Sequence, residues 1–422
     1  MKKNILLLLL LVCAYTYAQT DTVLVYSKPD TSKRSIKPDT LVNYKIGLIL
    51  PFQSEATTDN LNTFLNAPDF FTASRVQLDE DAVTSLNFYQ GLSIALSDRN
   101  DSVKLQLYIY DNNNSDSVTN ELLKLADVKA LNMIIGPVNY QTSKTVAEFC
   151  HQRCILNVQP FIPSKSITYN NPYHLKLAPT IDAHIDNMFQ SIVDSFEGAN
   201  IIIYAPDNEL GLSSAKRFDS LFTDYNKTAL TKFTHVLLNT KTMMVNGKKT
   251  TAAECLKPNK KNVWIITSFE ESFVNGSFRV MYNQLQKFDI VTYGMPTWLN
   301  GDVMRLDYVN DFQSHITSPF AVDTPQAQAK VDSFIAAYRS TYLMEPAANA
   351  YLGYDVMNFV LRALQCCGKD FLSQIVTQRY TGLGYKFDIT RQMSNDTTIN
   401  YFENRHVNVL QVRDYKIKKT WW

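Results

Sequence analysis

The chain has 422 residues, of which 45% are hydrophobic and 19% are charged. This length and composition are typical of a globular protein with two domains, each able to bury a substantial core. The 41 Lys and Arg residues nearly balance the 40 Asp and Glu residues, which excludes a strong overall charge that would attract nucleic acid or an anionic membrane and leaves room only for a local patch.

The first 18 residues have the features of a signal peptide. Two lysines are followed by an apolar run at residues 5–12, and Ala18 supplies a small residue at a candidate cleavage point. The run is too short to span a bilayer, and no later stretch is long and apolar enough to do so. Cys13 suggests the alternative of a lipoprotein, but Val12 before it is larger than that processing normally accepts. The sequence therefore predicts export to the periplasm or another extracytoplasmic compartment, without lipidation.

The cysteines do not form a pattern typical of a disulfide framework or of a metal site. Six are present, and an odd number remains without Cys13. Cys150 and Cys154 are close enough in sequence to pair in an oxidising compartment, although scattered cysteines are more often small buried thiols. Cys150, His151 and Cys154 resemble metal ligands, but they do not complete a zinc site. We therefore expect no metal and no cofactor, and the pairing of Cys150 with Cys154 stays open.

After the predicted signal peptide, residues 19–43 are polar and are predicted to form a flexible tether. The apolar run at residues 44–52 predicts the first strand. Residues 53–81 form a long connection that contains Phe64, Leu65, Phe70 and Phe71, so we expect part of it to be ordered. Hydrophobic periodicity then predicts, in chain order, a helix at 82–99, a strand at 103–110, a helix at 117–130 and strands at 133–135, 154–159 and 173–177.

The stretch at residues 133–143 joins a short buried strand to a helix predicted at residues 144–150. Gly136 and Pro137 end the strand, and a polar loop follows. In an open α/β sheet, ligands lie beyond the carboxyl ends of the strands and against helix N-termini. The loop would occupy that position, and the alternative is an ordinary strand-to-helix turn. The candidate ligand-binding residues of the loop are Asn139, Tyr140, Gln141, Thr142 and Ser143.

The alternation of strands and helices restarts after residue 180. It predicts a second α/β lobe of similar size, with parallel strands and right-handed crossovers as in the first. The tail at residues 385–421 alternates with period two and is predicted to be a hairpin or meander. The expected helices are at 181–196, 212–225, 274–288, 326–342 and 346–364, with Pro346 in a first turn, and the expected strands are at 200–204, 235–239, 263–268 and 290–293.

The order of these segments resembles the type I periplasmic binding fold, the Leu/Ile/Val-binding protein family, in its Bacteroidetes-type extracytoplasmic version. It is also distantly similar to cell-wall synthase activator lipoproteins. No single motif is specific, but the ordered series covers essentially all of the chain after the tether. The series is YKIGLILPF (44–52), LNFYQGLSIAL (86–96), VKLQLYIYD (103–111), IIGP (134–137), YHLKLAPT (173–180), FIAAYRSTYLMEP (334–346) and AYLGYDVMNFVLRAL (350–364).

The resemblance implies a fold with two Rossmann-like lobes, each built on a parallel sheet, that are joined by three chain crossings. We expect these crossings near residues 179–182, near 320–326 and within 388–400. Lobe 1 would then comprise residues 44–180 and about 321–394, and lobe 2 residues 181–320 and about 395–422.

The resemblance also implies a ligand site that draws on both lobes. Thr142 and Ser143 would hold a ligand carboxylate, and Gln159 stands where a small hydroxyl residue is usual. The second-lobe candidates are Asp207, Ser268, Glu270 and Trp298, in loops that also contain Asn208, Glu209 and Phe269. Each candidate has a structural alternative: packing for Tyr140 and Trp298, a solvated helix-start charge for Glu270, and a helix N-cap for Asp207, Thr142 or Ser143.

The sequence predicts a solute-binding or ligand-sensing protein that closes two lobes on a small polar ligand, either amino-acid-like or derived from the cell wall. The expected partners are that ligand and an envelope protein or transporter, with no nucleic acid. The alternative is a ligand-free interaction module that regulates peptidoglycan synthesis, suggested by Gln159 and by the long connection at 53–81. No phosphate-loop, dinucleotide, zinc-protease or serine-hydrolase motif occurs, so we do not expect an enzyme.

Overall fold

The computed structural model describes residues 22–26, 43–56, 58–59, 78–99, 103–241, 243–245, 247–299, 305–322, 328–368, 371–376 and 379–419. The predicted signal peptide lies outside these residues, as do Phe64, Leu65, Phe70 and Phe71 of the long connection. The chain divides into two compact units. Unit 1 comprises Met1–Ala178 and Val322–Arg405, and unit 2 comprises Pro179–Ala321 and His406–Trp422.

Within its described residues, unit 1 contains a nine-stranded sheet in the order β1-β3-β2-β4-β5-β6-β16-β15-β14. The strands from β3 to β16 in this order are parallel, whereas β1, β15 and β14 each run antiparallel to the neighbour that joins them to the sheet. The strands are β1 Thr22–Tyr26, β2 Asn43–Leu50, β3 Lys104–Asp111, β4 Met133–Ile135, β5 Leu156–Gln159, β6 His174–Lys176, β14 Arg379–Thr381, β15 Lys386–Met393 and β16 Ile399–Asn404.

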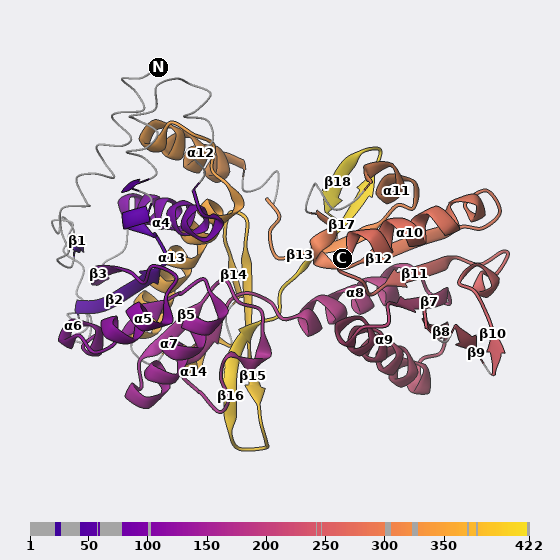
Figure 1. Cartoon of the computed structure of the whole chain (residues 1–422), viewed down its shortest axis with the longest axis horizontal. Coiled ribbons are helices and arrows are strands. Elements are labelled where there is room, and N and C mark those ends of the chain that lie inside the picture. The colour runs from indigo at the N-terminus through magenta and orange to yellow at the C-terminus, as the bar shows by residue number, and fades with distance from the viewer. Residues whose placement is uncertain are drawn as a thin grey trace. The chain divides into compact units, whose positions relative to one another are not determined.

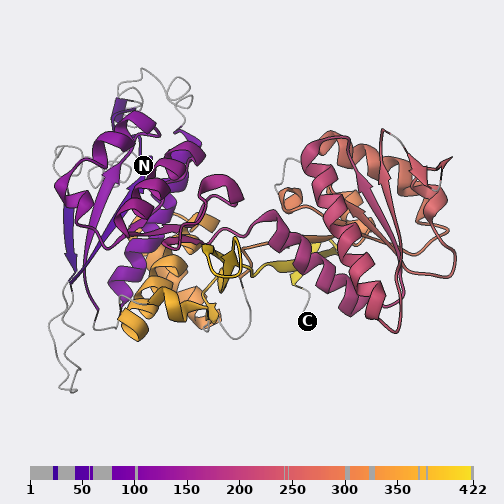
Figure 2. The ribbon, with the colours of Figure 1, turned by 90° about the horizontal axis from the view of Figure 1, so that it is seen from below.

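Helices cover both faces of this sheet, as Figures 1 and 2 show. On one face, α4 and α13 pack closely because both carry a glycine at the contact: a Cβ on Gly91 would overlap the carbonyl oxygen of Ala350, and one on Gly353 that of Phe88. The helices of unit 1 are α4 Glu80–Asp98, α5 Asp116–Leu122, α6 Ala126–Lys129, α7 Tyr140–Arg153, α12 Gln328–Tyr342, α13 Ala348–Cys367 and α14 Phe371–Ile375, with a 3₁₀ turn at Lys165–Ile167.

Unit 2 has a seven-stranded sheet in its described part, in the order β18-β17-β13-β12-β11-β7-β8. The strands from β13 to β8 are parallel, and β17 and β18 add an antiparallel hairpin at one edge. Helices again lie on both faces (Figure 1). The strands are β7 Asn200–Ala205, β8 Thr234–Asn239, β11 Asn262–Ile266, β12 Ile290–Gly294, β13 His315–Ser318, β17 Asn408–Arg413 and β18 Lys416–Lys419, and the helices are α8 Ile181–Ser195, α9 Glu209–Thr228, α10 Glu271–Met281 and α11 Leu306–Asp311.

The predicted α/β fold class is confirmed, and the physical basis is the burial of the strands on both faces. All residues of β11 and of β12 are buried, and β7 is buried except at Tyr204. Such strands are continuous apolar runs because helices cover both sides of a parallel sheet. The strand β13 and the helix α11 were not predicted from the sequence. Within the described residues, no helix is long and apolar enough to cross a membrane.

The tether prediction is wrong for residues 22–26, which form β1 and pair with β3. Their sequence, TVLVY, is rich in β-branched and aromatic residues that favour strands. The helix predicted at 117–130 is two helices, α5 and α6, separated by residues 123–125. Pro346 precedes α13 rather than lying in its first turn, since Ala347 is the N-cap residue.

The third passage of the chain between the units lies later than predicted. It falls between Arg405 and His406, whereas we expected it within residues 388–400. The reason is that residues 388–400 belong to a hairpin of β15 and β16, which pair with each other in the sheet of unit 1. The period-two tail therefore supplies one hairpin to each unit, the second being β17 and β18.

Candidate functional site

Each unit contains one point at which its parallel sheet reverses its order of growth. In unit 1 the chain runs from β2 to β3 on one side and then returns past β2 to form β4. In unit 2 it runs from β7 to β8 and then returns past β7 to form β11. At such a switch point the two neighbouring loops leave the sheet in opposite directions, and a ligand-sized space opens beyond the carboxyl ends of the strands. The loops after β2, β4, β7 and β11 are therefore the candidate site elements.

The loop after β4 is shaped by Gly136 and Pro137. Gly136 has a φ of +99°, and a Cβ there would overlap the carbonyl oxygen of Ile49 at the end of β2. The peptide bond between Gly136 and Pro137 is cis. Glycine is needed because only it combines this backbone conformation with so close an approach of two strands.

The polar loop predicted at residues 139–143 is the start of helix α7, which corrects the expected helix start at residue 144. Asn139 is the N-cap residue, and its side chain accepts a hydrogen bond from the backbone N–H of Gln141 at 2.8 Å. The alternative that Thr142 or Ser143 caps the helix is therefore wrong. Asparagine is among the preferred N-cap residues, so this start could have been found from the sequence.

Three of the predicted binding residues of unit 1 are buried and are hydrogen-bonded within unit 1. Ser143 donates to the carbonyl oxygen of Pro137 at 3.1 Å, and the amide nitrogen of Gln159 donates to that oxygen at 3.0 Å and to Ser143 Oγ at 2.8 Å. The amide oxygen of Gln159 accepts from the backbone N–H of Phe161 at 2.9 Å. Thr142 donates to the carbonyl oxygen of Asn139 at 3.2 Å. These groups hold the loop after β4 in place.

The more accessible groups of this loop are Asn139, Tyr140 and Gln141. Tyr140 is 40% exposed, and its hydroxyl lies 2.9 Å from Ser166 Oγ. Gln141 is exposed, and Asn139 is half-buried. The N-terminus of α7 thus presents an amide, a phenol and the positive end of the helix dipole to any ligand that reaches it.

The loop after β2 adds polar residues that the sequence analysis did not single out. The carboxylate of Asp111, at the end of β3, accepts from the backbone N–H groups of Gln53 at 3.2 Å and Ser54 at 2.8 Å. Gln53 has a φ of +50°, and its side-chain amide donates to Asp79 at 2.8 Å. No local motif marks these residues, because their association depends on the pairing of β2 with β3.

In unit 2, the loops after β7 and β11 are bridged across the switch point. Asn208 is the N-cap residue of α9 and accepts from the backbone N–H of Gly211 at 2.8 Å. Its amide nitrogen donates to the carboxylate of Glu270 at 3.3 Å. Glu270 stands at the start of α10 and is exposed. The structure therefore places Asn208 and Glu270 together, as the resemblance implied, and shows that Asn208 rather than Asp207 caps the helix.

The exposed end of this site carries further charge. Asp207 pairs with Lys241 Nζ at 3.3 Å, where the side chain of Asp207 is 41% exposed and that of Lys241 72%. Asn239, at the end of β8, donates to Asp207 at 3.5 Å. Glu209 is exposed in the first turn of α9. The acidic groups Asp207, Glu209 and Glu270 thus outnumber the single lysine at this edge.

Two of the predicted residues in unit 2 serve its interior. Trp298 is only 3% exposed, and its indole N–H donates to the carbonyl oxygen of Ser268 at 3.0 Å. Its ring packs against Phe278 and fills the space that a side chain at Gly294 would need. Ser268 is buried and accepts from the backbone N–H of Glu270 at 3.1 Å. The packing alternative for Trp298 therefore fits better than ligand stacking.

A buried lysine lies beside Gln159 at the carboxyl end of β6, and the sequence analysis did not single it out. Lys176 is 1% exposed and is paired in the sheet with Gln159 on one side and Glu403 on the other. Its ammonium lies 4.1 Å from the centre of the Tyr401 ring and has no hydrogen-bond partner among the described residues. Burial lowers the pKa of Lys176 to about 8, and the charge of Glu403 partly opposes this.

The structure also bears on the cysteines. Cys150 and Cys154 are free thiols, Cys150 being buried and Cys154 exposed, so the pairing left open by the sequence is not formed. Cys366 and Cys367 form a disulfide. Among the residues that the structure describes, no group of three or more His, Cys, Asp or Glu side chains is placed to hold a metal ion.

No protein-family model matches the chain, and no curated protein matches it. Several solved structures do. A branched-chain amino acid ABC transporter protein from Rhodospirillum rubrum is 13% identical, covers 90% of this chain and 100% of its own, and superposes with a TM-score of 0.61.

Two further structures give the same result. A branched-chain amino acid ABC transporter periplasmic ligand-binding protein from Burkholderia xenovorans is 10% identical, with 90% of this chain and 95% of that chain covered and a TM-score of 0.57. An ABC transporter substrate-binding protein from Desulfitobacterium hafniense, solved in complex with Leu, is 14% identical, with 90% and 100% covered and a TM-score of 0.53. The chain therefore has the fold of the type I periplasmic binding proteins, as the order of its segments predicted.

Proposed function

We propose that this chain is an extracytoplasmic solute-binding or ligand-sensing protein that takes a small polar ligand, amino-acid-like or derived from the cell wall. The observation that carries the proposal is the chemistry at the two switch points. Unit 1 presents the N-terminus of α7 with Asn139, Tyr140 and Gln141, and unit 2 presents the Asn208–Glu270 pair. Solved proteins of the same fold bind solutes such as Leu, which supports the proposal.

The charges of the two edges suit a ligand with both an acidic and a basic end. A helix N-terminus favours a carboxylate or another anion. The carboxylate of Glu270 accepts a hydrogen bond from a neutral amide only, so it remains able to take the ammonium group of a ligand. Charge-assisted hydrogen bonds of this kind are roughly twice as strong as neutral ones.

The test is a thermal-shift screen of the full chain against amino acids, dipeptides and soluble cell-wall fragments, followed by calorimetry with each ligand that raises the melting temperature. We expect Glu270→Gln to weaken binding by about tenfold or more, because it removes one charge-assisted bond of roughly 1.5–3 kcal/mol. The side-chain oxygen of the new amide can still accept from Asn208, so the local fold should be retained.

Glu271→Gln is the matched control, because Glu271 is an exposed neighbour in the first turn of α10 and carries the same charge. It should leave the affinity within about twofold, a change of under 0.5 kcal/mol. Equal losses in the two variants would mean that only the general field of the acidic edge matters. A screen in which no compound raises the melting temperature would contradict ligand binding.

The alternative function, a ligand-free interaction module, is favoured by one observation. Thr142, Ser143 and Gln159, which the resemblance assigned to the ligand, are all buried and hydrogen-bonded within unit 1. For this alternative we expect a negative ligand screen together with crosslinking in the cell that recovers one envelope protein reproducibly. Crosslinking that recovers no envelope protein would count against it.

A further inference from the structure

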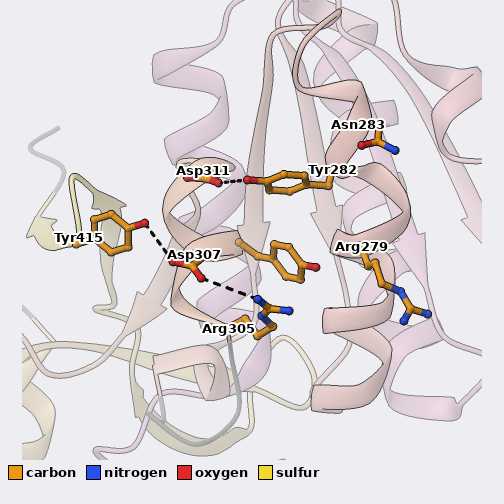
Figure 3. Close-up of a pocket in the computed structure, with 8 residues that line it drawn as sticks. Arg279, Tyr282, Asn283, Arg305, Asp307, Asp311 and Tyr415 are labelled. Carbon is orange, nitrogen blue, oxygen red and sulfur yellow. Dashed lines mark hydrogen bonds and ion pairs between the residues drawn. The ribbon is translucent and has the colours of Figure 1, made fainter.

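Unit 2 carries an open cavity of about 550 Å³ that lies apart from the switch-point loops. Figure 3 shows its lining, which comes from the last turns of α10, from α11 and from the turn between β17 and β18. The residues that the following argument uses are Arg279, Tyr282, Arg305, Asp307, Asp311 and Tyr415. We call these residues and the exposed side chains next to them in sequence the α10–α11 surface.

This surface lies at the opposite end of the sheet of unit 2 from the proposed ligand site. Helix α10 starts after the carboxyl end of β11 and runs back to the amino end of the parallel strand β12, so its last turn lies at the amino ends. Helix α11 leads into the amino end of β13, and Tyr415 follows β17, which is antiparallel to β13. The surface is therefore independent of the loops after β7 and β11.

The carboxylates of this surface are held by tyrosines. Tyr282 donates its hydroxyl proton to Asp311, and Tyr415 donates to Asp307 at 3.1 Å (Figure 3). Arg305 reaches Asp307 only at 4.0 Å. These bonds fix the tyrosine rings and leave the arginines weakly neutralised.

Arg279 is the least neutralised cation of the surface. It is exposed and forms no hydrogen bond or ion pair with any residue that the structure describes. In Figure 3 its guanidinium points away from Asp307 and Asp311, and no interaction joins it to the other residues drawn. An arginine in this state is able to make a bidentate pair with a carboxylate of another molecule.

Exposed apolar side chains adjoin the cavity residues in sequence. Val280 is 70% exposed, Leu306 54%, Tyr415 59% and Ile417 61%. Tyrosine and arginine are enriched at protein interfaces, and a gathering of exposed apolar side chains marks an interaction site.

Tyr415 also occupies an unusual backbone position. With Asp414 it forms the two-residue turn of the β17–β18 hairpin, and the two residues have φ values of +55° and +56°. Such turns favour Asn-Gly, and a bulky side chain at positive φ is strained. The hairpin thus accepts strain at the residue whose hydroxyl reaches Asp307.

The hairpin extends the positive charge of the surface. Strand β18 is the last strand in the order of the sheet, and it contributes the exposed residues Lys416 and Lys418 next to Tyr415 and Ile417. Lys418 lies 3.4 Å from Asp414, and these side chains are both more than half exposed. An extended acidic segment would find basic groups and an open strand edge here.

We propose that the α10–α11 surface docks an acidic segment of a partner protein. The segment pairs a carboxylate with Arg279 and buries an aliphatic or aromatic side chain against Leu306 and the tyrosines. Charge complementarity selects the occupant, because the basic groups near the cavity are exposed whereas its carboxylates already accept from tyrosines. A peptide must therefore combine acidic and apolar residues to bind, and neither property suffices alone.

The test is fluorescence anisotropy of the full chain with a short labelled peptide in which Glu alternates with Tyr and Leu. Two control peptides replace either Glu by Lys or the Tyr and Leu residues by Ser. We expect the first peptide to bind and both controls to bind at least about tenfold more weakly. Arg279→Glu should weaken the first peptide by about tenfold or more, whereas Lys216→Glu, an exposed charge reversal on α9, should leave its affinity within about twofold.

A second pair of variants tests the apolar part without touching charge. Leu306→Ser should weaken the peptide, and Leu230→Ser, at a residue that is fully exposed elsewhere in unit 2, should not. The proposal is overturned by equal losses with Arg279→Glu and Lys216→Glu, by no binding of the acidic peptide, or by inorganic phosphate or citrate competing at the same affinity as the peptide. Self-association that Arg279→Glu abolishes would instead identify a second copy of the chain as the occupant.

Discussion

Lys176 is the residue whose environment departs most from what its chemistry requires. It is 1% exposed, and its ammonium faces the Tyr401 ring and has no hydrogen-bond partner among the described residues. Taking a charge out of water costs more than a cation–π contact of roughly 2 kcal/mol restores. Burial accordingly lowers the pKa of Lys176 to about 8. The folded protein therefore prefers the neutral amine.

Lys176→Met should stabilise the protein at pH 7 by about 2 kcal/mol or more, because a shift of each pKa unit corresponds to about 1.4 kcal/mol. The folded-state pKa is lower than the unfolded one, so the wild-type protein loses protons on folding between about pH 8 and the unfolded pKa of about 10.4. Its stability relative to the variant should rise with pH across that window. Urea unfolding of both proteins at pH 7, 9 and 10 measures this.

A difference in unfolding free energy that stays constant from pH 7 to pH 10 would contradict the buried-charge account. Loss of stability in Lys176→Met at pH 7 would contradict it as well, since the ammonium would then be favourably bound. Arg405 pairs with Glu403 at 2.6 Å in the native protein, so removal of the lysine does not leave that carboxylate without a cation.

At this scale, the sequence identified residue types and their neighbourhood better than their roles. Asn208 and Glu270 lie where the resemblance placed them, whereas Ser143, Gln159 and Trp298 are bound into the interior. The difference could not be predicted because a serine hydroxyl after a strand looks the same whether it faces a ligand or the carbonyl of a cis Gly-Pro turn. Lys176 was missed for the same reason, since only the register of β6 with β5 and β16 shows that it is buried.

The packing of α4 against α13 is the contact between elements that the sequence determines most tightly. Gly353 faces the carbonyl oxygen of Phe88, and Gly91 faces that of Ala350, so the two backbones approach without intervening side chains. Gly353→Ala should therefore destabilise the protein by about 2–4 kcal/mol, because backbone on both sides must shift. Chemical denaturation monitored by circular dichroism measures the change.

Gly276→Ala is the matched control. Gly276 lies within α10, and a Cβ there would have no neighbour within 4 Å. Alanine should stabilise the helix by about 0.5–1 kcal/mol, because glycine loses more backbone entropy on folding. If both substitutions changed stability in the same direction by similar amounts, the helix–helix contact would not be the cause.

The sequence predicted elements well where their periodicity was strong and poorly where pairing decides. The central strands and the long helices of both units lie within a few residues of the expected ranges. The strand β1 was taken as part of a polar tether, because a short apolar run is recognised as a strand only once β3 offers it an edge. The start of α7 could have been read from Asn139, whereas the break between α5 and α6 has no marked breaker residue.

For the molecule as a whole, the two-unit α/β architecture could be predicted from the order of segments. The third passage of the chain could not, because two similar hairpins follow α13 and only strand pairing assigns the first to unit 1 and the second to unit 2. Export and cleavage after Ala18 also belong to this scale. We expect the intact mass of the protein secreted from its host to lack the first 18 residues, and a mass that includes them would contradict a cleaved signal peptide.

Native mass spectrometry of the full mature chain tests the central claim, ligand binding, most directly. The account predicts a species heavier than the polypeptide by one small molecule, either after gentle purification or after addition of pooled amino acids, dipeptides and cell-wall fragments. Denaturation should release the added mass, and Glu270→Gln should reduce the bound fraction while Glu271→Gln should not. A spectrum that shows only the bare polypeptide under all of these conditions would contradict a solute-binding function.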